Sequence, residues 1–150
     1  MTHRLKEVNA PSDAGNAAEV PSQLMHWPIQ LSLVSPHAPY FADADLLLVA
    51  DCVPLAMGDF HNRFLKNHSI AVGCPKLDDA DFYIEKLSEI LKANRLRSLT
   101  VIHMEVPCCS GLTRIARQAI SRAGIVLPFD DITISLRGET KGTSRVEAGQ

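Results

Sequence analysis

The stretch VIHMEVPCCSGLTRIARQAI, residues 101–120, decides the fold class because a strand pattern passes into a helix pattern across a short turn. The segment 98–106 is largely apolar, as in a strand buried on both faces. From Ser110, a candidate N-cap, apolar residues recur at helical spacing until Gly124, a candidate helix stop. The apolar stripe of this helix consists of Leu112, Ile115, Ala116, Ala119, Ile120 and Ala123.

The same alternation continues on both sides of this strand–turn–helix unit. An amphipathic helix is expected over 77–94, and Asp78 or Asp79 is placed to cap its start. Residues 53–65 are expected to form a short helix or an irregular turn. Further strands are expected at 28–34, 45–52, 69–74 and 131–136.

Strands that alternate with helices predict an α/β fold with three layers. We expect a mostly parallel sheet of about five strands with helices on both faces, of the Rossmann or flavodoxin kind. The alternating pattern places this α/β domain, which contains all four cysteines of the chain and is therefore called cysteine-rich, at 26–139. Residues 1–25 and 140–150 are polar, lack a period and are expected to be flexible tails.

All four cysteines follow or end expected strands. Cys52 ends the strand 45–52, Cys74 ends the strand 69–74, and Cys108 and Cys109 follow the strand 98–106. Because the carboxyl ends of parallel strands meet at one edge of a sheet, we expect the four thiols to converge. Four thiolates suit an iron–sulfur cluster or zinc. The helix start beside the adjacent pair would also favour its thiolate form.

Free cysteine is also common as a small core residue, and this interpretation stays open for each thiol alone. Four further polar residues are expected near the same edge, as hydrogen-bonding neighbours of the ligands: Asp59, His61, His103 and Glu105. A surface position for His61 and a core position for His103 explain those two residues equally well.

Composition limits the classes of partner. The chain of 150 residues has a net charge of −2 and only 5% aromatic residues, which argues against nucleic acid as a partner. The longest apolar run is strand-length and the N-terminal stretch lacks a signal-like apolar region, so we expect no membrane association and a cytoplasmic location. In the cytoplasm thiols stay reduced, which favours metal-binding or redox cysteines over structural disulfides.

Three segments in combination, DCVP…GDFH, GCPKLDD and MEVPCC, carry a family resemblance. From about Trp27 to Glu139 the chain resembles the cysteine-rich domain of ferredoxin-associated iron–sulfur cluster-binding proteins. The resemblance implies a cluster, of the 4Fe-4S type, with Cys52, Cys74, Cys108 and Cys109 as ligands. Members of that family usually carry a bacterial ferredoxin module ahead of this domain, whereas residues 1–26 here contain no cysteine.

The first functional hypothesis is therefore an iron–sulfur protein that transfers electrons to, or assists, a partner redox enzyme. A zinc-dependent hydratase or hydrolase with Cys52, His103 and Cys108 as ligands is the first alternative. A metal-free thiol redox protein that uses Cys108 and Cys109 is the second. An interaction module that has lost its cofactor is the third. Whether the chain is an enzyme stays open, as does a homodimer with a cluster bridging two chains.

Overall fold

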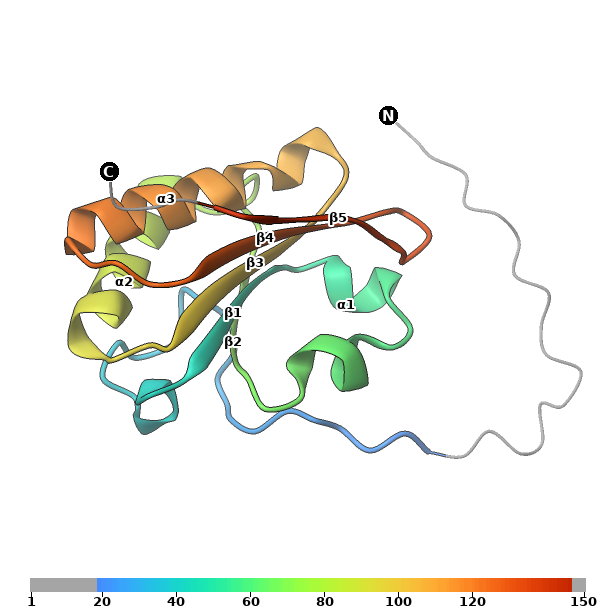
Figure 1. The fold of residues 1–150 in the computed structure, drawn as a ribbon, viewed down its shortest axis with the longest axis horizontal. Coiled ribbons are helices and arrows are strands. Elements are labelled where there is room, and N and C mark those ends of the chain that lie inside the picture. The colour runs from blue at the N-terminus through green and yellow to red at the C-terminus, as the bar shows by residue number, and fades with distance from the viewer. Residues whose placement is uncertain (1–18, 147–150) are drawn as a thin grey trace, which may run out of the picture.

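The structure is a computed structural model that describes residues 19–146, and its centre is a five-stranded sheet with the order β2-β1-β3-β4-β5. The first four strands run parallel, and β5 is antiparallel to β4 (Figure 1). This arrangement confirms the expected α/β fold with a mostly parallel sheet. The strands are β1 (Asp45–Ala50), β2 (Ser69–Gly73), β3 (Ser98–Met104), β4 (Phe129–Ile134) and β5 (Thr140–Arg145).

Helices lie on both faces of the sheet. The two long helices, α2 (Ala80–Ala93) and α3 (Gly111–Ala123), pack side by side on one face (Figure 1). The segment after β1 contains the short helix α1 (Val53–Ala56) and the π-helical turn η2 (His61–Leu65), and it contacts the opposite face of β2. Two further 3₁₀ turns are η1 (Pro39–Phe41) and η3 (Pro107–Cys109).

The ends of the long helices agree with two of the expected signals and disagree with one. The Asp79 side chain caps α2 by accepting a hydrogen bond from the Asp81 N–H at 2.9 Å. Gly124 ends α3 in the left-handed conformation, with φ of 68°. Ser110 makes no side-chain cap, because its hydroxyl donates to the Pro107 carbonyl oxygen at 2.8 Å instead.

The core is continuous through the sheet and both helical layers. Strand β2 is buried at every position and β1 at all but its first residue, which explains their nearly unbroken apolar sequences. The largest fully buried side chains are Tyr83, Phe41 and Phe129.

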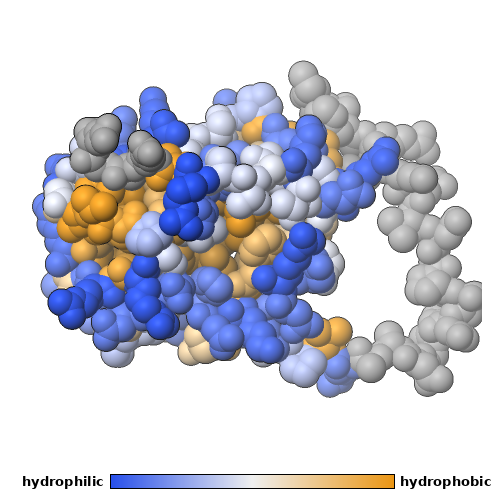
Figure 2. Space-filling model, viewed as in Figure 1, coloured by the Kyte–Doolittle hydropathy of each residue, from blue (hydrophilic) through white to orange (hydrophobic). Residues whose placement is uncertain are grey.

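Polar residues cover much of the face shown in Figure 2, and an apolar area remains near the end of α3. Just after that helix Val126 is exposed.

The expected strand at 28–34 is wrong. Gln30 forms only a single bridge with Val72. The carbonyl oxygen of Gln30 then accepts hydrogen bonds from the N–H groups of Leu33 and Val34, and this turn directs the chain away from the sheet. The segment still lies along the outer edge of β2, because the Leu31 N–H donates to the Val72 carbonyl oxygen at 2.9 Å.

The fifth strand comes instead from the expected C-terminal tail. Residues 140–145 form β5, so the tail boundary at residue 140 is wrong. The sequence TKGTSR carries no apolar alternation because this edge strand is mostly exposed, and its pairing with β4 depends on backbone hydrogen bonds. Of the expected N-terminal tail, residues 1–18 lie outside the described part. Gln23 is described and contacts η2, since its N–H donates to His61 Nδ1 at 3.0 Å.

Candidate functional site

The three loops that carry cysteines emerge at one edge of the sheet. β2, β1 and β3 are adjacent and parallel, and Cys52, Cys74 and the Cys108–Cys109 pair all lie beyond their carboxyl ends. The strand order reverses between β1 and β3, because the chain goes from β1 outward to β2 and then returns across to β3. Such a reversal opens a crevice at the carboxyl ends, where ligands bind in open α/β sheets.

Contacts between the loops bring the sulfur atoms into one neighbourhood. Cys109 interacts electrostatically with both Cys108 and Cys52, so the loops after β1 and β3 meet there. The start of α3 also lies against the loop after β2, since a Cβ on Gly111 would stand 3.2 Å from Pro75 Cβ. The structure thus brings together the loops of all four predicted cysteines.

The four thiols differ in exposure. Cys52 and Cys108 are exposed, Cys74 is partly buried and Cys109 is buried. Burial raises the pKa of the Cys109 thiol to about 11; a backbone hydrogen bond at Met104 opposes this shift, and Cys108 and Cys52 reinforce it. The expected thiolate character at the helix start is therefore wrong for Cys109. The shared turn η3 points one neighbour into the core and leaves the other in solvent.

A buried tyrosine fixes the loop after β2. The hydroxyl of Tyr83 in α2 accepts a hydrogen bond from the Cys74 N–H at 3.1 Å and donates one to the Asp78 carboxylate. The Cys74 carbonyl oxygen accepts the N–H groups of Leu77 and Asp78 at 3.2 and 3.1 Å, which closes a tight turn. Burial and the hydrogen bond to Asp78 raise the pKa of Tyr83 far above its ordinary value, so its hydroxyl stays a donor.

Asp51 lies between Cys52 and the sheet. Its N–H donates to the Gly73 carbonyl oxygen at 3.2 Å, so it extends the pairing of β1 with β2. Its Oδ1 atom is buried and has no hydrogen-bond partner among residues 19–146. Burial raises the pKa of the Asp51 carboxyl, a side-chain hydrogen bond with Gln30 opposes this shift, and the nearby Asp78 reinforces it.

His103 is a buried residue, one position before the carboxyl end of β3. It is 8% exposed, and its Nε2 atom lies 2.7 Å from Oδ1 of Asp131 on β4. Its Nδ1 atom lies 2.9 Å from the Met104 carbonyl oxygen. Asp131 in turn accepts a hydrogen bond from the Thr113 hydroxyl of α3 at 3.2 Å. Both ring nitrogens of His103 therefore already face oxygen atoms.

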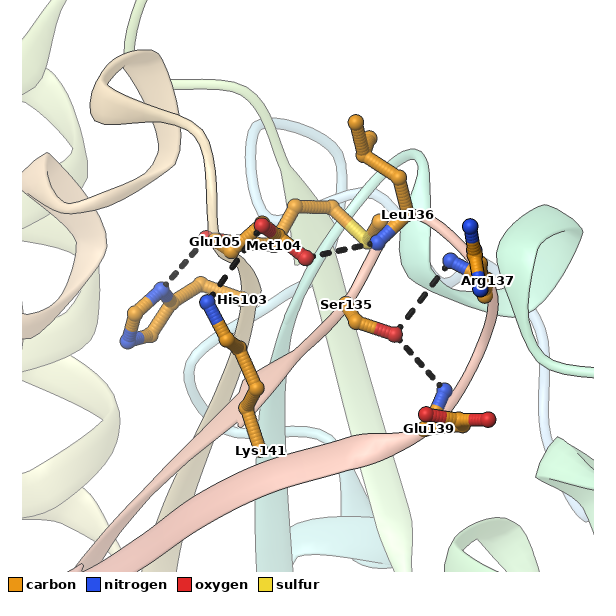
Figure 3. Close-up of polar contacts among 8 residues, drawn as sticks. All are labelled: His103, Met104, Glu105, Ser135, Leu136, Arg137, Glu139 and Lys141. Atoms are coloured by element: carbon orange, nitrogen blue, oxygen red, sulfur yellow. Dashed lines mark hydrogen bonds and ion pairs between the residues drawn. The ribbon is translucent and has the colours of Figure 1, made fainter. Parts of the chain in front are cut away.

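Glu105 organises the turn between β4 and β5 (Figure 3). One carboxylate oxygen accepts the Leu136 N–H at 2.9 Å, and the other lies 3.5 Å from the Lys141 ammonium. The Ser135 hydroxyl oxygen accepts the N–H groups of Arg137 and Glu139 within the same turn. Glu105 thus links the end of β3 to the β4–β5 turn and to Lys141 of β5. Its expected place beside the cysteine ligands stays a prediction.

The two remaining predicted residues lie on the segment after α1. Asp59 is largely exposed and forms an ion pair with Arg63 at 3.8 Å, one helical turn away. His61 lines a cavity, and its Nδ1 atom is occupied by the Gln23 N–H.

Sequence reasoning missed Tyr83 and Asp131, and it named Asp78 only as a candidate cap of the helix over 77–94. The signals for them were weak, namely a glycine at the end of a buried strand and two adjacent aspartates within the strand that became β4.

The four thiols have the donor type of an iron–sulfur cluster, but the described residues form no ready-made metal site. Within residues 19–146 no three His, Cys, Asp or Glu side chains stand as ligands around a single ion. The zinc set of Cys52, His103 and Cys108 does not fit, because Asp131 and the Met104 carbonyl already occupy the His103 nitrogens. A four-iron cluster takes one thiolate at each of four separated corners, and four thiols on adjacent loops match that donor set in kind and number.

No helix in the described part is long and apolar enough to cross a bilayer.

One comparison with known proteins, a family model, agrees with the fold of the structure. A family model described as a Rossmann-like domain matches residues 38–148, from the turn before η1 to beyond β5. A protein of Archaeoglobus fulgidus, described only as an uncharacterized protein, is 31% identical over 123 residues, which cover 82% of this chain and 86% of that protein. No solved structure matches. Neither description names a cofactor, so the cluster stays a prediction. The chain belongs to the family of Rossmann-like domains that this model defines.

Proposed function

We propose that this protein binds an iron–sulfur cluster, of the 4Fe-4S type, at the carboxyl edge of β2, β1 and β3 and transfers electrons to a partner redox protein. The observation that supports the proposal most is the meeting of three cysteine-bearing loops at the crevice where strand order reverses. When bound, such a cluster accepts and releases one electron at a time.

The four proposed ligands differ in what binding requires of them. Cys52, Cys74 and Cys108 are wholly or partly exposed, so their thiols can lose protons to solvent as iron binds. Cys109 begins as a buried thiol with a pKa of about 11, so its deprotonation at neutral pH costs free energy. We therefore expect Cys52, Cys74 and Cys108 to be indispensable ligands and Cys109 to be the weakest of the four.

The cluster environment comes from the same loops. Met57 and Phe60 are each 2% exposed and lie in the segment that follows Cys52, where they restrict solvent access from the face opposite α2 and α3. Tyr83 holds the Cys74 backbone in place through its hydroxyl. Positions fixed by buried side chains favour ligand binding because less ordering is required when the cluster enters.

Anaerobic reconstitution with iron and sulfide tests the proposal through the protein's own spectrum. We expect broad thiolate-to-iron absorbance near 400 nm and, after reduction, an electron paramagnetic resonance signal. Cys52→Ser, Cys74→Ser and Cys108→Ser should each lose most of that absorbance, while Cys109→Ser should retain a larger share. Asp59→Asn, which changes an exposed residue that pairs with Arg63, is the control and should leave the spectrum unchanged.

A thiol redox function for Cys108 and Cys109 is the second candidate, because the two side chains share a hydrogen bond. Exposed Cys108 would attack a disulfide of a partner protein and form a mixed disulfide. Cys109 would then displace the partner, so that two thiols are oxidised as the partner disulfide is reduced. A reversible mass loss of two hydrogens in metal-free protein, confined to the peptide with both cysteines, supports this function over the cluster.

A further inference from the structure

A cavity of about 280 Å³ lies on the sheet face opposite α2 and α3. Its floor is formed by Ile70 and Val72 of β2, which alternate with residues that face the long helices. Leu65 of η2 and Phe60, which directly precedes η2, form one wall. Ile29 closes the side next to the outer edge of β2. The cavity is therefore bounded mainly by apolar side chains drawn from three separate segments.

Three polar residues interrupt this apolar lining: Gln30, Asp51 and His61. Gln30 hydrogen-bonds the Asp51 carboxyl and so orients it. His61 is held by the Gln23 N–H at its Nδ1 atom. Asp51 supplies the carboxyl group of the three. Its Oδ1 atom is too deeply buried to touch a molecule in the cavity, so a ligand can reach the carboxyl only at its other oxygen, Oδ2.

The carboxyl groups at this end of the cavity favour one class of head group. Asp78 lies close enough to interact electrostatically with Asp51, so two carboxyl groups set the charge at this end of the cavity. A cationic donor is favoured there over a neutral one, because a charge-assisted hydrogen bond is stronger than one between neutral groups. An anionic group is disfavoured by the same two carboxylates. The volume of about 280 Å³ is sufficient for one aromatic ring with a short side chain, since a cavity of about 150 Å³ accommodates benzene.

We propose that this cavity binds a small molecule with an apolar, aryl-sized body and a primary ammonium head group that donates to Asp51. The apolar body would contact Ile70, Val72 and Phe60, and the ammonium group would pair with the Asp51 carboxylate where that group lines the cavity. Pockets of this kind, apolar with a few oriented polar groups, are the usual form of small-molecule sites. The proposal does not rest on the cluster, because none of the four cysteines lines the cavity.

Three probes of equal size and different head group test the proposal on the full chain: 2-phenylethylamine, 2-phenylethanol and phenylacetate. Titrations followed by ¹H–¹⁵N NMR at pH 7 should show saturable shifts at Gln30, His61 and Ile70 with the amine. We expect the amine to bind about tenfold more tightly than the alcohol, and the carboxylate to bind at least tenfold more weakly than the amine. Because this ranking is measured on the natural chain, it does not depend on the folding of any variant.

Two variants then assign the head-group contact. Asp51→Asn should lower amine affinity about tenfold and leave alcohol affinity within about twofold, whereas the control Asp59→Asn should change neither. Equal binding of the three probes, tighter binding of phenylacetate, or no saturable shifts at the cavity residues would each overturn the proposal. An amine preference that survives Asp51→Asn would overturn the assignment to Asp51.

Discussion

The contact between Gly73 and Tyr83 offers a sharp test of how the loop after β2 is held. A Cβ atom added at Gly73 would stand 2.4 Å from Tyr83 Oη and 2.7 Å from two of its ring carbons. Ordinary contact begins at 3.4 Å, so Tyr83 must move by about 3.4 − 2.4 = 1.0 Å in Gly73→Ala. Tyr83 is fully buried and its hydroxyl joins Cys74 to Asp78, so this movement disturbs both packing and hydrogen bonds.

The expected cost follows from these two terms. Overpacking of a dense core costs about 1–3 kcal/mol, and weakening the two hydrogen bonds adds about 1 kcal/mol. We therefore expect Gly73→Ala to lower the free energy of unfolding by about 2–4 kcal/mol in urea titrations. For a chain of this length the melting temperature should fall by roughly 5–12 °C.

Two companion variants separate this mechanism from a general effect of adding a methyl group. Gly58→Ala has nothing within 4 Å of the new Cβ and should stay within about 1 kcal/mol of the natural chain. Tyr83→Phe removes the closest atom but keeps the ring, so its combination with Gly73→Ala should cost about 1 kcal/mol less than the sum of the single changes. A Gly73→Ala protein as stable as Gly58→Ala would refute the reasoning.

Three further expectations concern other parts of the fold. Asp131→Asn, which weakens the contact with buried His103, should destabilise by about 1–3 kcal/mol in urea. Asp130→Asn, whose partner Arg145 is exposed, should cost less than about 1 kcal/mol, and equal effects would contradict the burial argument. Gly138→Ala places a Cβ 2.2 Å from the Ala56 carbonyl oxygen at a φ of +83°, so the melting temperature should drop by several degrees. Gly142→Ala, with no atom within 4 Å of the new Cβ, should hardly change it, and the reverse order would show that the β4–β5 turn does not pack against α1. In metal-free protein at pH 7.5, iodoacetamide should modify Cys52 and Cys108 while leaving Cys109 almost unlabelled in peptide mass spectra. Because its folded pKa is about 11 against an ordinary 9.0, Cys109 should also make stability fall as pH rises from about 9 to 11, a loss that Cys109→Ala should not show.

The sheet could be predicted wherever its strands are buried. β1, β2 and β3 have long apolar runs because both their faces are covered, and those runs are visible in the sequence. β5 could not be found in this way, since TKGTSR is largely exposed and follows β4 only through a turn set by Ser135 and Gly138. At 28–34 the error was the opposite one, since a strand was predicted where none forms. Leu31 and Val34 are buried, as strand residues would be, but they belong to a turn.

The cysteine edge could be predicted from topology alone, whereas the state of each thiol could not. The position of a cysteine after a parallel strand determines the edge at which it lies. The burial of Cys109 and exposure of Cys108 depend on the direction of the η3 turn, which leaves no periodic signal in the sequence. The partner of His103 depends on the β3–β4 register, which pairs Val101 with Asp131, and a register is not visible in either strand separately.

The most direct test of the central claim is the iron and acid-labile sulfide content of the protein, purified without oxygen and reconstituted. The account predicts about four iron and four sulfide per chain. Replacement of all four cysteines by serine should reduce both to background while the secondary structure by circular dichroism is retained. A natural chain that stays colourless and free of iron and sulfide, although folded and fully reduced, would contradict it.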